Sequence, residues 1–349
     1  MATDVSALVL HEPLQLALET RSCAEPGPDE VLVAPRVVGI CGSDMHLYRE
    51  GKIGDSVVRA PLVLGHEAAG RVVAIGRDVT RFAVGDRVII EPGLACGSCR
   101  LCRLGRYNLC TNVRFLGIPP TDGLMTGLAR VPERWVYHLP DALSDAEGAM
   151  IEPFAVGLQA AQEAGIQPGQ SVAILGAGPI GLMVLQAVRV RGAGVVISID
   201  LAERALAAAT QLGASAAINP RQQDPVAAVR ELTGGEGADV VIEAVGATPT
   251  IRQTLDLVAR GGIVCLVGIS SEAAVPLNVN AIVRRGVHVR STFRYAHQHP
   301  VALALAAAGR VDLLSPITHR FPLADAVDAF RYVDQNKNEV VKGVIELAN

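Results

Sequence analysis

SVAILGAGPIGLMVLQAVRVR, residues Ser171 to Arg191, is the stretch from which the fold of this chain can be read. Its first part, up to Leu175, predicts a short buried strand, and its last part, Pro179 to Val190, has the length and apolar spacing of a helix. A G-x-G-x-x-G turn joins the two, made of Gly176, Ala177, Gly178, Pro179, Ile180 and Gly181. Glycines there permit a tight turn, close approach of backbone to a pyrophosphate, and close packing of helix on strand. The helix N-terminus would direct unpaired N–H groups at the phosphates.

An acidic residue closes the next apolar run. Asp200 follows Val195 to Ile199, about 20 residues beyond the glycine turn, which is where a dinucleotide-binding unit carries its ribose-binding carboxylate. A carboxylate can accept both ribose hydrogen bonds and would repel a 2′-phosphate, so NAD is favoured over NADP. The alternative is a glycine-rich turn in an ordinary βα unit.

Length and composition limit the class of protein. The chain has 349 residues, so two domains are expected, and it is 50% hydrophobic but only 3% aromatic, which suits a buried parallel sheet. No apolar run is long enough to span a membrane, and the N-terminus lacks a basic region before its apolar stretch, so a soluble cytoplasmic protein is expected. The net charge of −4, without a basic block, argues against nucleic acid or membrane partners.

The order of predicted elements indicates two domains. Short β-rich runs fill the chain up to Arg134, a helical pattern starts at the capping box Ser144 and Glu147, and strands then alternate with helices. Six strands in a doubly wound parallel (Rossmann) sheet are expected, at residues 171–175, 195–199, 216–218, 239–245, 263–267 and 287–292. Residues 316–321 and 340–346 are predicted strands that return to the first domain. We therefore expect an α/β protein with a β-rich catalytic domain at 1–153, a cofactor domain at 154–293, and a return at 294–349.

Four of the seven cysteines lie in one loop, with the spacing C-x2-C-x2-C-x7-C. Four thiolates can close a tetrahedron around Zn²⁺ with no position left for water, which is typical of a structural site. An iron–sulfur cluster and reduced bystander thiols are the alternatives. The predicted structural zinc ligands are Cys96, Cys99, Cys102 and Cys110.

A second group of possible ligands is scattered. Cys41 and His66-Glu67 each follow a predicted strand, and Glu152 stands just before the cofactor domain. Each could be only a buried structural residue. However, hydride leaves an alcohol carbon most readily when its oxygen is alkoxide-like, and an open zinc site with three protein ligands would favour that state.

Several segments together resemble the zinc-containing medium-chain dehydrogenases, and within them the polyol branch of sorbitol and xylitol dehydrogenases. They are GICGSDMH, VLGHEAAG, GDRVIIEPG, the four-cysteine loop, IEPFAVG, GAGPIG, and Phe293-Arg294-Tyr295. The resemblance covers nearly the whole chain. It implies a discontinuous GroES-like catalytic domain, NAD, one catalytic and one structural zinc per chain, and a homotetramer.

The resemblance also implies roles for single residues. Cys41, His66 and Glu67 match catalytic zinc ligands, while Glu152 matches a residue that holds the water and accepts the proton, with direct ligation possible. Ser43 and His46 match a relay that passes the alcohol proton to solvent. The polyol pocket would be lined by Tyr48, Phe115, Arg294 and Tyr295. Further cofactor contacts would come from Val267, Gly268, Ile269, Thr292 and Phe293.

One residue departs from the family pattern, and several of the assigned residues have a simpler interpretation. The basic residue that usually follows the ribose carboxylate by five positions is here Arg204, which follows Asp200 by only four. From the residues alone, Arg294 could form a salt bridge, Tyr48 and Phe115 could simply pack, Ser43 could be a turn residue, and His46 could be solvated. His297 and His299 are predicted to be surface residues.

The leading interpretation is an NAD-dependent zinc polyol dehydrogenase, of the L-iditol 2-dehydrogenase and xylitol dehydrogenase type, that interconverts a polyol and a ketose. The same reaction on 2,3-butanediol, L-threonine or a simple secondary alcohol is the second interpretation. A nucleotide-binding protein without activity would be expected to have lost Cys41, His66 or Ser43, and none is lost.

Overall fold

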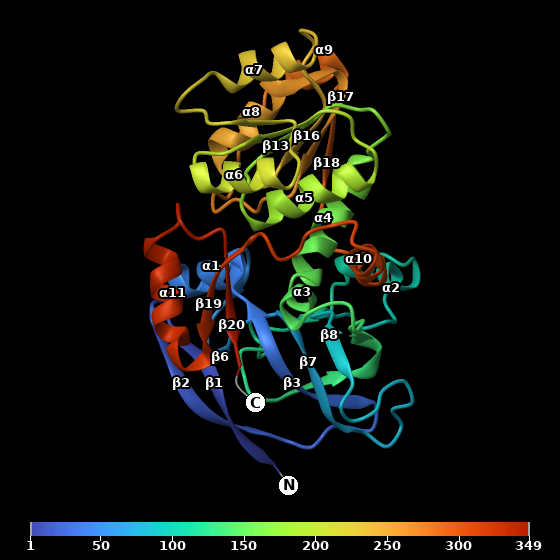
Figure 1. Cartoon of the computed structure of the whole chain (residues 1–349), viewed down its shortest axis with the longest axis vertical. Helices are drawn as coiled ribbons and strands as arrows, with labels where there is room; N and C mark the ends of the chain where they lie inside the picture. The colour runs from blue at the N-terminus through green and yellow to red at the C-terminus, as the bar shows by residue number, and fades with distance from the viewer. Residues whose placement is uncertain (1, 348–349) are drawn as a thin grey trace. The chain divides into compact units, whose positions relative to one another are not determined.

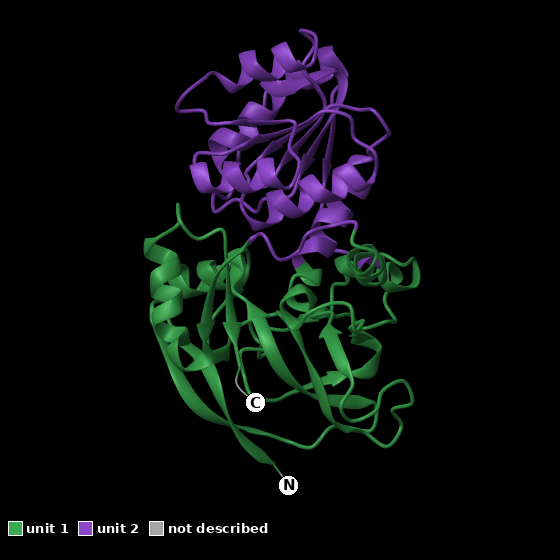
Figure 2. Cartoon of the chain, in the orientation of Figure 1, with its two compact units in different colours: residues 1–152, 299–309, 317–349 green, residues 153–298, 310–316 purple. Residues whose placement is uncertain are grey.

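The computed structural model describes residues 2–347 and divides them into two compact units (Figure 2). The first unit comprises residues 1–152, 299–309 and 317–349, and the second comprises 153–298 and 310–316. Among the described residues, no helix combines the length and apolar content needed to cross a membrane.

The second unit is built on a six-stranded parallel sheet with the order β15-β14-β13-β16-β17-β18. This confirms the predicted doubly wound sheet, because strand order reverses between β13 and β16. Its strands are β13 (Val172–Leu175), β14 (Val196–Ile199), β15 (Ala216–Ile218), β16 (Ala238–Glu243), β17 (Val258–Leu266) and β18 (His288–Ser291).

Helices cover both faces of this sheet, with α5 and α6 on one side and α7 and α8 on the other (Figure 1). Every residue of β13 and β14 is buried, as expected for central parallel strands. The helices are α4 (Ile151–Ala164), α5 (Pro179–Val190), α6 (Glu203–Gln211), α7 (Pro225–Leu232), α8 (Thr248–Leu257) and α9 (Val279–Arg285).

The first unit is rich in antiparallel β-structure. Its larger sheet has the order β12-β8-β7-β3-β20-β19, with β11 also paired to β3, and a smaller sheet has the order β2-β1-β6. The late strand β20 lies antiparallel to β3, so the end of the chain completes a sheet begun near its start. These strands are β1 (Thr3–Glu12), β2 (Gln15–Cys23), β3 (Glu30–Gly39), β6 (Leu62–Val63), β7 (Glu67–Ile75), β8 (Arg87–Ile90), β11 (Ala129–Pro132), β12 (Val136–His138), β19 (Ile317–Pro322) and β20 (Lys342–Glu346).

Short elements connect these sheets. The capping box is confirmed, since the backbone N–H of Ser144 donates to Glu147 and that of Glu147 donates to the Ser144 hydroxyl. The remaining elements are α1 (Gly42–Glu50), β4 (Lys52–Ile53), β5 (Ser56–Val57), β9 (Gly93–Leu94), α2 (Arg100–Arg103), η1 (Tyr107–Leu109), β10 (Arg114–Phe115), η2 (Glu133–Trp135), α3 (Asp145–Ala149), α10 (Gln298–Ala307), η3 (Leu323–Asp325) and α11 (Ala326–Gln335).

A buried polar cluster lies beside β8 and corrects one prediction. His297 is exposed as predicted, but the prediction that His299 is a surface residue is wrong: it is fully buried and stacks on Tyr137, with ring centroids 5.6 Å apart. Its Nδ1 lies 3.6 Å from an oxygen of Glu91, and the Tyr137 hydroxyl donates to the same oxygen at 2.8 Å. A polar residue at the start of a helix is buried here because an aromatic ring covers it.

The two buried groups have pKa values shifted in opposite directions. Burial raises the pKa of Glu91 to about 7, although hydrogen bonds from Tyr137 and Tyr107 oppose the shift. Burial lowers the pKa of His299 to about 3, because the imidazolium would lose its hydration. Near pH 6 the cluster is therefore largely uncharged.

Replacing Glu91 with Gln should change how stability depends on pH. Between pH 4.5 and about 7 the folded protein keeps the Glu91 proton that the unfolded chain releases, so wild-type stability falls as pH rises through this window. Glutamine cannot titrate. The difference in unfolding free energy between the two proteins, wild type minus Glu91→Gln, should therefore fall by up to about 3 kcal/mol from about pH 5 to pH 7 and then level off. Denaturant titrations across this range measure it, and a difference independent of pH would contradict the assignment.

Candidate functional site

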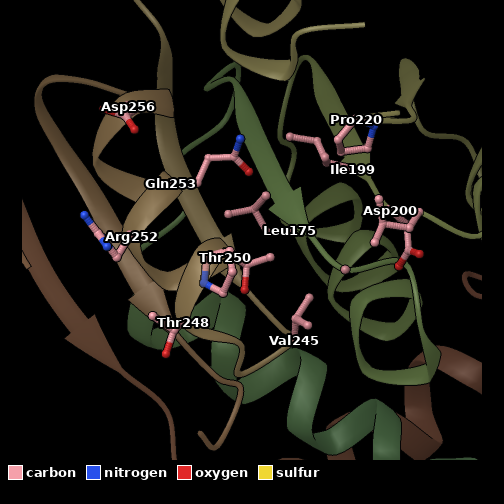
Figure 3. Close-up of a pocket in the computed structure, with 13 residues that line it drawn as sticks. Leu175, Ile199, Asp200, Pro220, Val245, Thr248, Thr250, Arg252, Gln253 and Asp256 are labelled. Atoms are coloured by element: carbon pink, nitrogen blue, oxygen red, sulfur yellow. The ribbon is translucent and has the colours of Figure 1, made fainter. Parts of the chain in front are cut away.

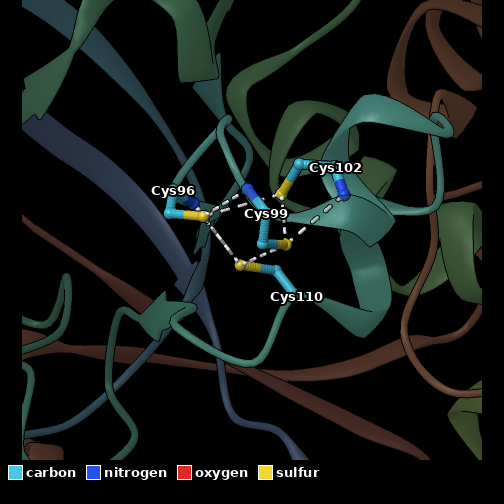
Figure 4. Close-up of side chains that lie close together, drawn as sticks. All are labelled: Cys96, Cys99, Cys102 and Cys110. Atoms are coloured by element: carbon cyan, nitrogen blue, oxygen red, sulfur yellow. Dashed lines mark hydrogen bonds between the residues drawn. The ribbon is translucent and has the colours of Figure 1, made fainter.

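The four loop cysteines converge on one point (Figure 4). The Sγ atoms of Cys99 and Cys102 are 3.4 Å apart, those of Cys96 and Cys110 are 3.5 Å apart, and two further pairs are 3.9 Å apart. A zinc–sulfur bond of about 2.3 Å implies thiolates about 3.8 Å apart in a tetrahedron. The cysteines therefore fit one zinc ion, whereas the several metal atoms of a cluster would hold thiolates farther apart.

The backbone of this loop favours thiolates. N–H groups of Cys99, Cys102 and Cys96 point at the sulfurs of Cys96, Cys99 and Cys110, at 3.4 to 3.5 Å. Hydrogen bonds from the backbone of Ser98 and Cys99 lower the pKa of Cys96 to about 5. Burial raises the pKa of Cys102 to about 12, so a metal ion would have to displace the Cys102 proton.

Cys41, His66 and Glu67 form a second group that could hold a metal ion, with ligand atoms within 4.8 Å of one another. Cys41 caps the start of α1 just after β3, while His66 and Glu67 meet at the start of β7. Because β3 and β7 are paired with Gly39 opposite Glu67, the strand register brings the two segments together. A thiolate, an imidazole and a carboxylate suit Zn²⁺ and leave a coordination position open.

Sequence reasoning missed the residue that holds the first two of these ligands in place. Asp44 is fully buried in α1; its carboxylate accepts a hydrogen bond from the backbone N–H of Cys41 at 2.9 Å and lies 3.6 Å from Nδ1 of His66. Burial opposes the charged imidazolium, but Asp44 and then Cys41 raise the pKa of His66 well above its ordinary value. An acidic residue three positions after a helix-capping cysteine was the signal available.

A buried lysine was missed as well. Lys342 in β20 is 1% exposed, forms an ion pair with Glu67, and donates to the carbonyl oxygen of Ile40 at 3.0 Å. Burial disfavours its charge, yet the Glu67 carboxylate, with Cys41 and Glu152 also contributing, raises the pKa of Lys342. The ammonium group is therefore charged inside the protein, directly beside a predicted zinc ligand.

The remaining predicted residues of the first unit have different surroundings. Glu152, in the first turn of α4, is buried and close enough to Lys342 to influence its pKa, but it is not part of the group of three ligands. Ser43 and His46 lie on α1, with Nδ1 of His46 3.3 Å from Glu50. The ring of Phe115 meets His66 edge-on at 5.4 Å. Tyr48 is buried against Phe330 at 5.8 Å.

Arg294 and Tyr295 belong to the second unit. Arg294 has a φ of 55°, an unusual backbone conformation for a residue other than glycine, and its guanidinium lies over the Phe293 ring at 4.6 Å. Tyr295 and Thr292 are buried, while Phe293 is 45% exposed. Strained backbone of this kind is typical of functional sites.

A cavity of about 630 Å³ opens at the carboxyl ends of the strands of the second unit (Figure 3). Asp200 lines it, and its carboxylate accepts the N–H of Ala177 at 2.7 Å, so the acidic residue is tied to the glycine turn. Gly176 has a φ of 97°, and a Cβ at Gly181 would overlap the Gly176 carbonyl oxygen. A Cβ at Gly178 would meet nothing within 4 Å, so this side of the turn is open to a ligand.

Arg204 and Arg252 lie differently with respect to this cavity. Arg204 is exposed on α6 and is not among the residues that line the cavity, whereas Arg252 of α8 is. Val267 and Gly268 follow β17, and their N–H groups donate to the Glu243 carbonyl oxygen at 2.8 and 3.1 Å. Ile269 is 50% exposed.

Comparisons with known proteins agree with this arrangement. Residues 27–141 match the alcohol dehydrogenase GroES-like domain, and residues 179–308 match the zinc-binding dehydrogenase family. The chain is 41% identical to a sorbitol dehydrogenase of Bacillus subtilis, over 98% of this chain and 97% of that one.

Solved structures share the whole fold. An Escherichia coli oxidoreductase/dehydrogenase of unknown specificity superposes with a TM-score of 0.95 at 40% identity, covering 99% of this chain and 100% of that one. A Sinorhizobium meliloti protein described as a zinc-binding dehydrogenase, solved bound to NADP, has a TM-score of 0.91 at 33% identity, with 99% of each chain covered.

The loss of stability caused by removing the Lys342 charge should depend on whether metal is bound. Lys342→Met leaves Glu67 buried without its cation, which should cost about 3–5 kcal/mol in unfolding free energy after chelation. If Glu67 binds zinc, the loss should be clearly smaller in zinc-loaded protein. Chemical denaturation of both forms measures this, with Lys337→Met as the control, because Lys337 is 61% exposed and pairs with Asp334 only at the surface. Equal losses in both forms would argue against ligation by Glu67.

Cys102→Ser should remove one zinc ion. Three thiolates hold zinc far less tightly than four, so zinc content measured by atomic emission should fall by about one ion per chain, and the first unit should become easier to unfold. Cys23→Ser is the control, since Cys23 lies outside both ligand groups. Unchanged zinc content in Cys102→Ser would refute the structural site.

Proposed function

The chain belongs to the zinc-containing medium-chain dehydrogenases, in their polyol branch, and we propose that it oxidises a secondary alcohol of a polyol such as sorbitol or xylitol to the ketose with NAD. The observation that carries this proposal is the convergence of Cys41, His66 and Glu67 in a chain that also carries the glycine turn and Asp200.

The metal would be held by Cys41, His66 and Glu67. Zinc supplies Lewis acidity toward an alcohol oxygen, and the nicotinamide supplies the hydride acceptor. Asp44 orients His66 and the backbone before α1, while Lys342 holds Glu67 by its carboxylate. The lysine also limits how much negative charge the two anionic ligands place in the site, which favours an alcohol substrate over a cationic one.

Proton removal is assigned to Glu152, Ser43 and His46. Glu152 is buried near the charged Lys342, where a carboxylate can hold a water molecule or accept a proton. Ser43 and His46 lie three residues apart on α1, so their side chains share a face of the helix, and the half-exposed His46 ring can deliver a proton to solvent.

Substrate recognition is assigned to Tyr48, Phe115, Arg294 and Tyr295. Arginine and tyrosine side chains donate hydrogen bonds to several hydroxyl groups at once, and a site built for hydroxyls rejects substrates without them. Phe115 would give the pocket an apolar wall next to His66.

The cofactor is proposed to be NAD rather than NADP. The Asp200 carboxylate lines the cavity beside the glycine turn. There it can accept hydrogen bonds from both ribose hydroxyl groups and would repel a 2′-phosphate. Gly176, Gly178, Pro179, Ile180 and Gly181 would hold the pyrophosphate, and the nicotinamide half would contact Val267, Gly268, Ile269, Thr292 and Phe293. Arg204 would contact the adenine end of the cofactor only.

We further propose one catalytic and one structural zinc per chain, a cytoplasmic location, and a homotetramer. Strand β18 is an exposed edge of the sheet, and Val283 of the neighbouring α9 is 73% exposed. These features support assembly, because the unpaired backbone N–H and C=O groups of an edge strand can pair with a strand of another chain.

A panel of alcohols tests the function. Purified zinc-loaded protein with NAD should reduce the cofactor in the presence of sorbitol, xylitol or arabinitol, as measured by absorbance of the reduced nicotinamide. The specificity constant kcat/KM should be at least about tenfold higher with NAD than with NADP, since repulsion by Asp200 is worth at least about 1.4 kcal/mol. The matched variant is Asp200→Ala, in which kcat/KM with NAD should exceed kcat/KM with NADP by a smaller factor.

Turnover of ethanol, 2,3-butanediol or L-threonine without any polyol activity would refute the substrate class. A preference for NADP would refute the role given to Asp200.

A further inference from the structure

Glu243 stands at the end of β16, in the centre of the sheet of the second unit. It pairs in register with Leu175 of β13 on one side and Leu266 of β17 on the other. Its side chain is fully buried. A buried glutamate in the middle of a parallel sheet is costly unless its carboxylate is well satisfied, so its surroundings call for an explanation.

The Glu243 carboxylate organises the turn that follows its own strand. It accepts hydrogen bonds from the N–H groups of Val245 at 3.0 Å and Gly246 at 2.9 Å, and from the Thr250 hydroxyl at 2.7 Å. Among the described residues no cation pairs with this carboxylate. Its hydrogen-bond donors are therefore the uncharged N–H and hydroxyl groups named above. These bonds hold residues 244–247 and the first turn of α8 in one geometry.

The turn held by Glu243 packs against both neighbouring loops. A Cβ at Gly176 would come within 2.7 Å of a methyl group of Val245, and a Cβ at Gly268 would overlap the nitrogen of Gly246. The backbone carbonyl of Glu243 also accepts the N–H groups of Val267 and Gly268. One residue therefore fixes the spacing between the glycine turn, the turn 244–247 and the segment 267–269.

The same turn forms one wall of the cavity that Asp200 lines. Val245, Thr248 and Thr250 line this cavity together with Asp200 and Leu175 (Figure 3). We infer that Glu243 is a positioning residue for the dinucleotide: it holds this wall at the distance from the glycine turn that the cofactor requires, without touching the cofactor. The inference rests on the proposed function, which supplies the identity of the ligand.

The amide of glutamine would keep one carbonyl oxygen for the three bonds to Oε1, and would lose only the bond from Gly246 to Oε2 at 3.1 Å. Leucine has a similar size but accepts nothing, and would leave the N–H groups of Val245 and Gly246 without this acceptor. The Thr250 hydroxyl would keep only its bond to the Ala247 carbonyl oxygen at 2.9 Å. The two substitutions therefore separate the hydrogen bonds of the side chain from its volume.

The test is NADH binding to zinc-loaded full-length protein, measured by nicotinamide fluorescence, together with the thermal midpoint of the cofactor-free protein. Glu243→Leu should raise the Kd for NADH about tenfold or more, and Glu243→Gln should restore most of the affinity. KM for NAD should rise with Kd, while kcat at saturating NAD should change much less. Glu236→Leu and Glu236→Gln are matched controls at an exposed glutamate before β16 and should bind NADH like wild type.

A Glu243→Leu protein with a lower thermal midpoint but a Kd within twofold of wild type would show a purely structural role and overturn the inference. If Glu243→Leu does not fold, Thr250→Val decides. This change removes the hydroxyl that bonds to Glu243 and to the Ala247 carbonyl oxygen, and it should raise the Kd for NADH about threefold or more. An unchanged Kd would overturn the inference. Wild-type protein that binds NADH but oxidises no polyol would refute the proposed substrate and leave Glu243 testable. Wild-type protein that does not bind NADH would refute the cofactor and this inference together.

Discussion

The buried ion pair between Glu67 and Lys342 is the interaction on which the metal-ligand group depends. Lys342 lies on the last strand, yet its ammonium group reaches both the carboxylate after His66 and the carbonyl oxygen of Ile40, the residue before Cys41. It therefore ties β20 to the two segments that carry the ligands. Charges buried to this extent are tolerated only when both partners are in place, so the late strand is needed for the site as well as for the sheet.

The second unit solves a similar problem with uncharged donors. Asp200 follows β14 and Glu243 ends β16, the two strands that flank β13 in one parallel sheet. Backbone N–H groups of the surrounding turns donate to both carboxylates. Turns that must approach a dinucleotide closely have no room for long basic side chains, which is consistent with the glycines that surround them. Buried carboxylates thus position backbone turns in the second unit, whereas the ion pair of Glu67 and Lys342 positions predicted metal ligands in the first.

Predictions failed where burial came from a distant partner. His299 was expected at the surface, but it stacks on Tyr137 and lies beside Glu91 inside the first unit. Asp44 was missed because its one signal, the spacing from Cys41, is also that of an ordinary acid in the first turn of a helix. Lys342 was missed because it looks like an ordinary lysine at the start of a strand. Arg252 of α8 lines the same cavity as Asp200, and no local pattern in the sequence marked it.

The sequence by itself determined the features that rest on neighbouring residues: the strand, glycine turn and helix around Gly176, the six-stranded sheet, and the spacing of four cysteines that lets one loop enclose an ion. Local backbone geometry suffices for these, because the interacting groups are a few residues apart. Only the tertiary structure decided that Lys342 meets Glu67, that His299 lies beneath Tyr137, and that Glu243 joins three turns. Those contacts depend on strand order and register, which bring together residues that share no local pattern.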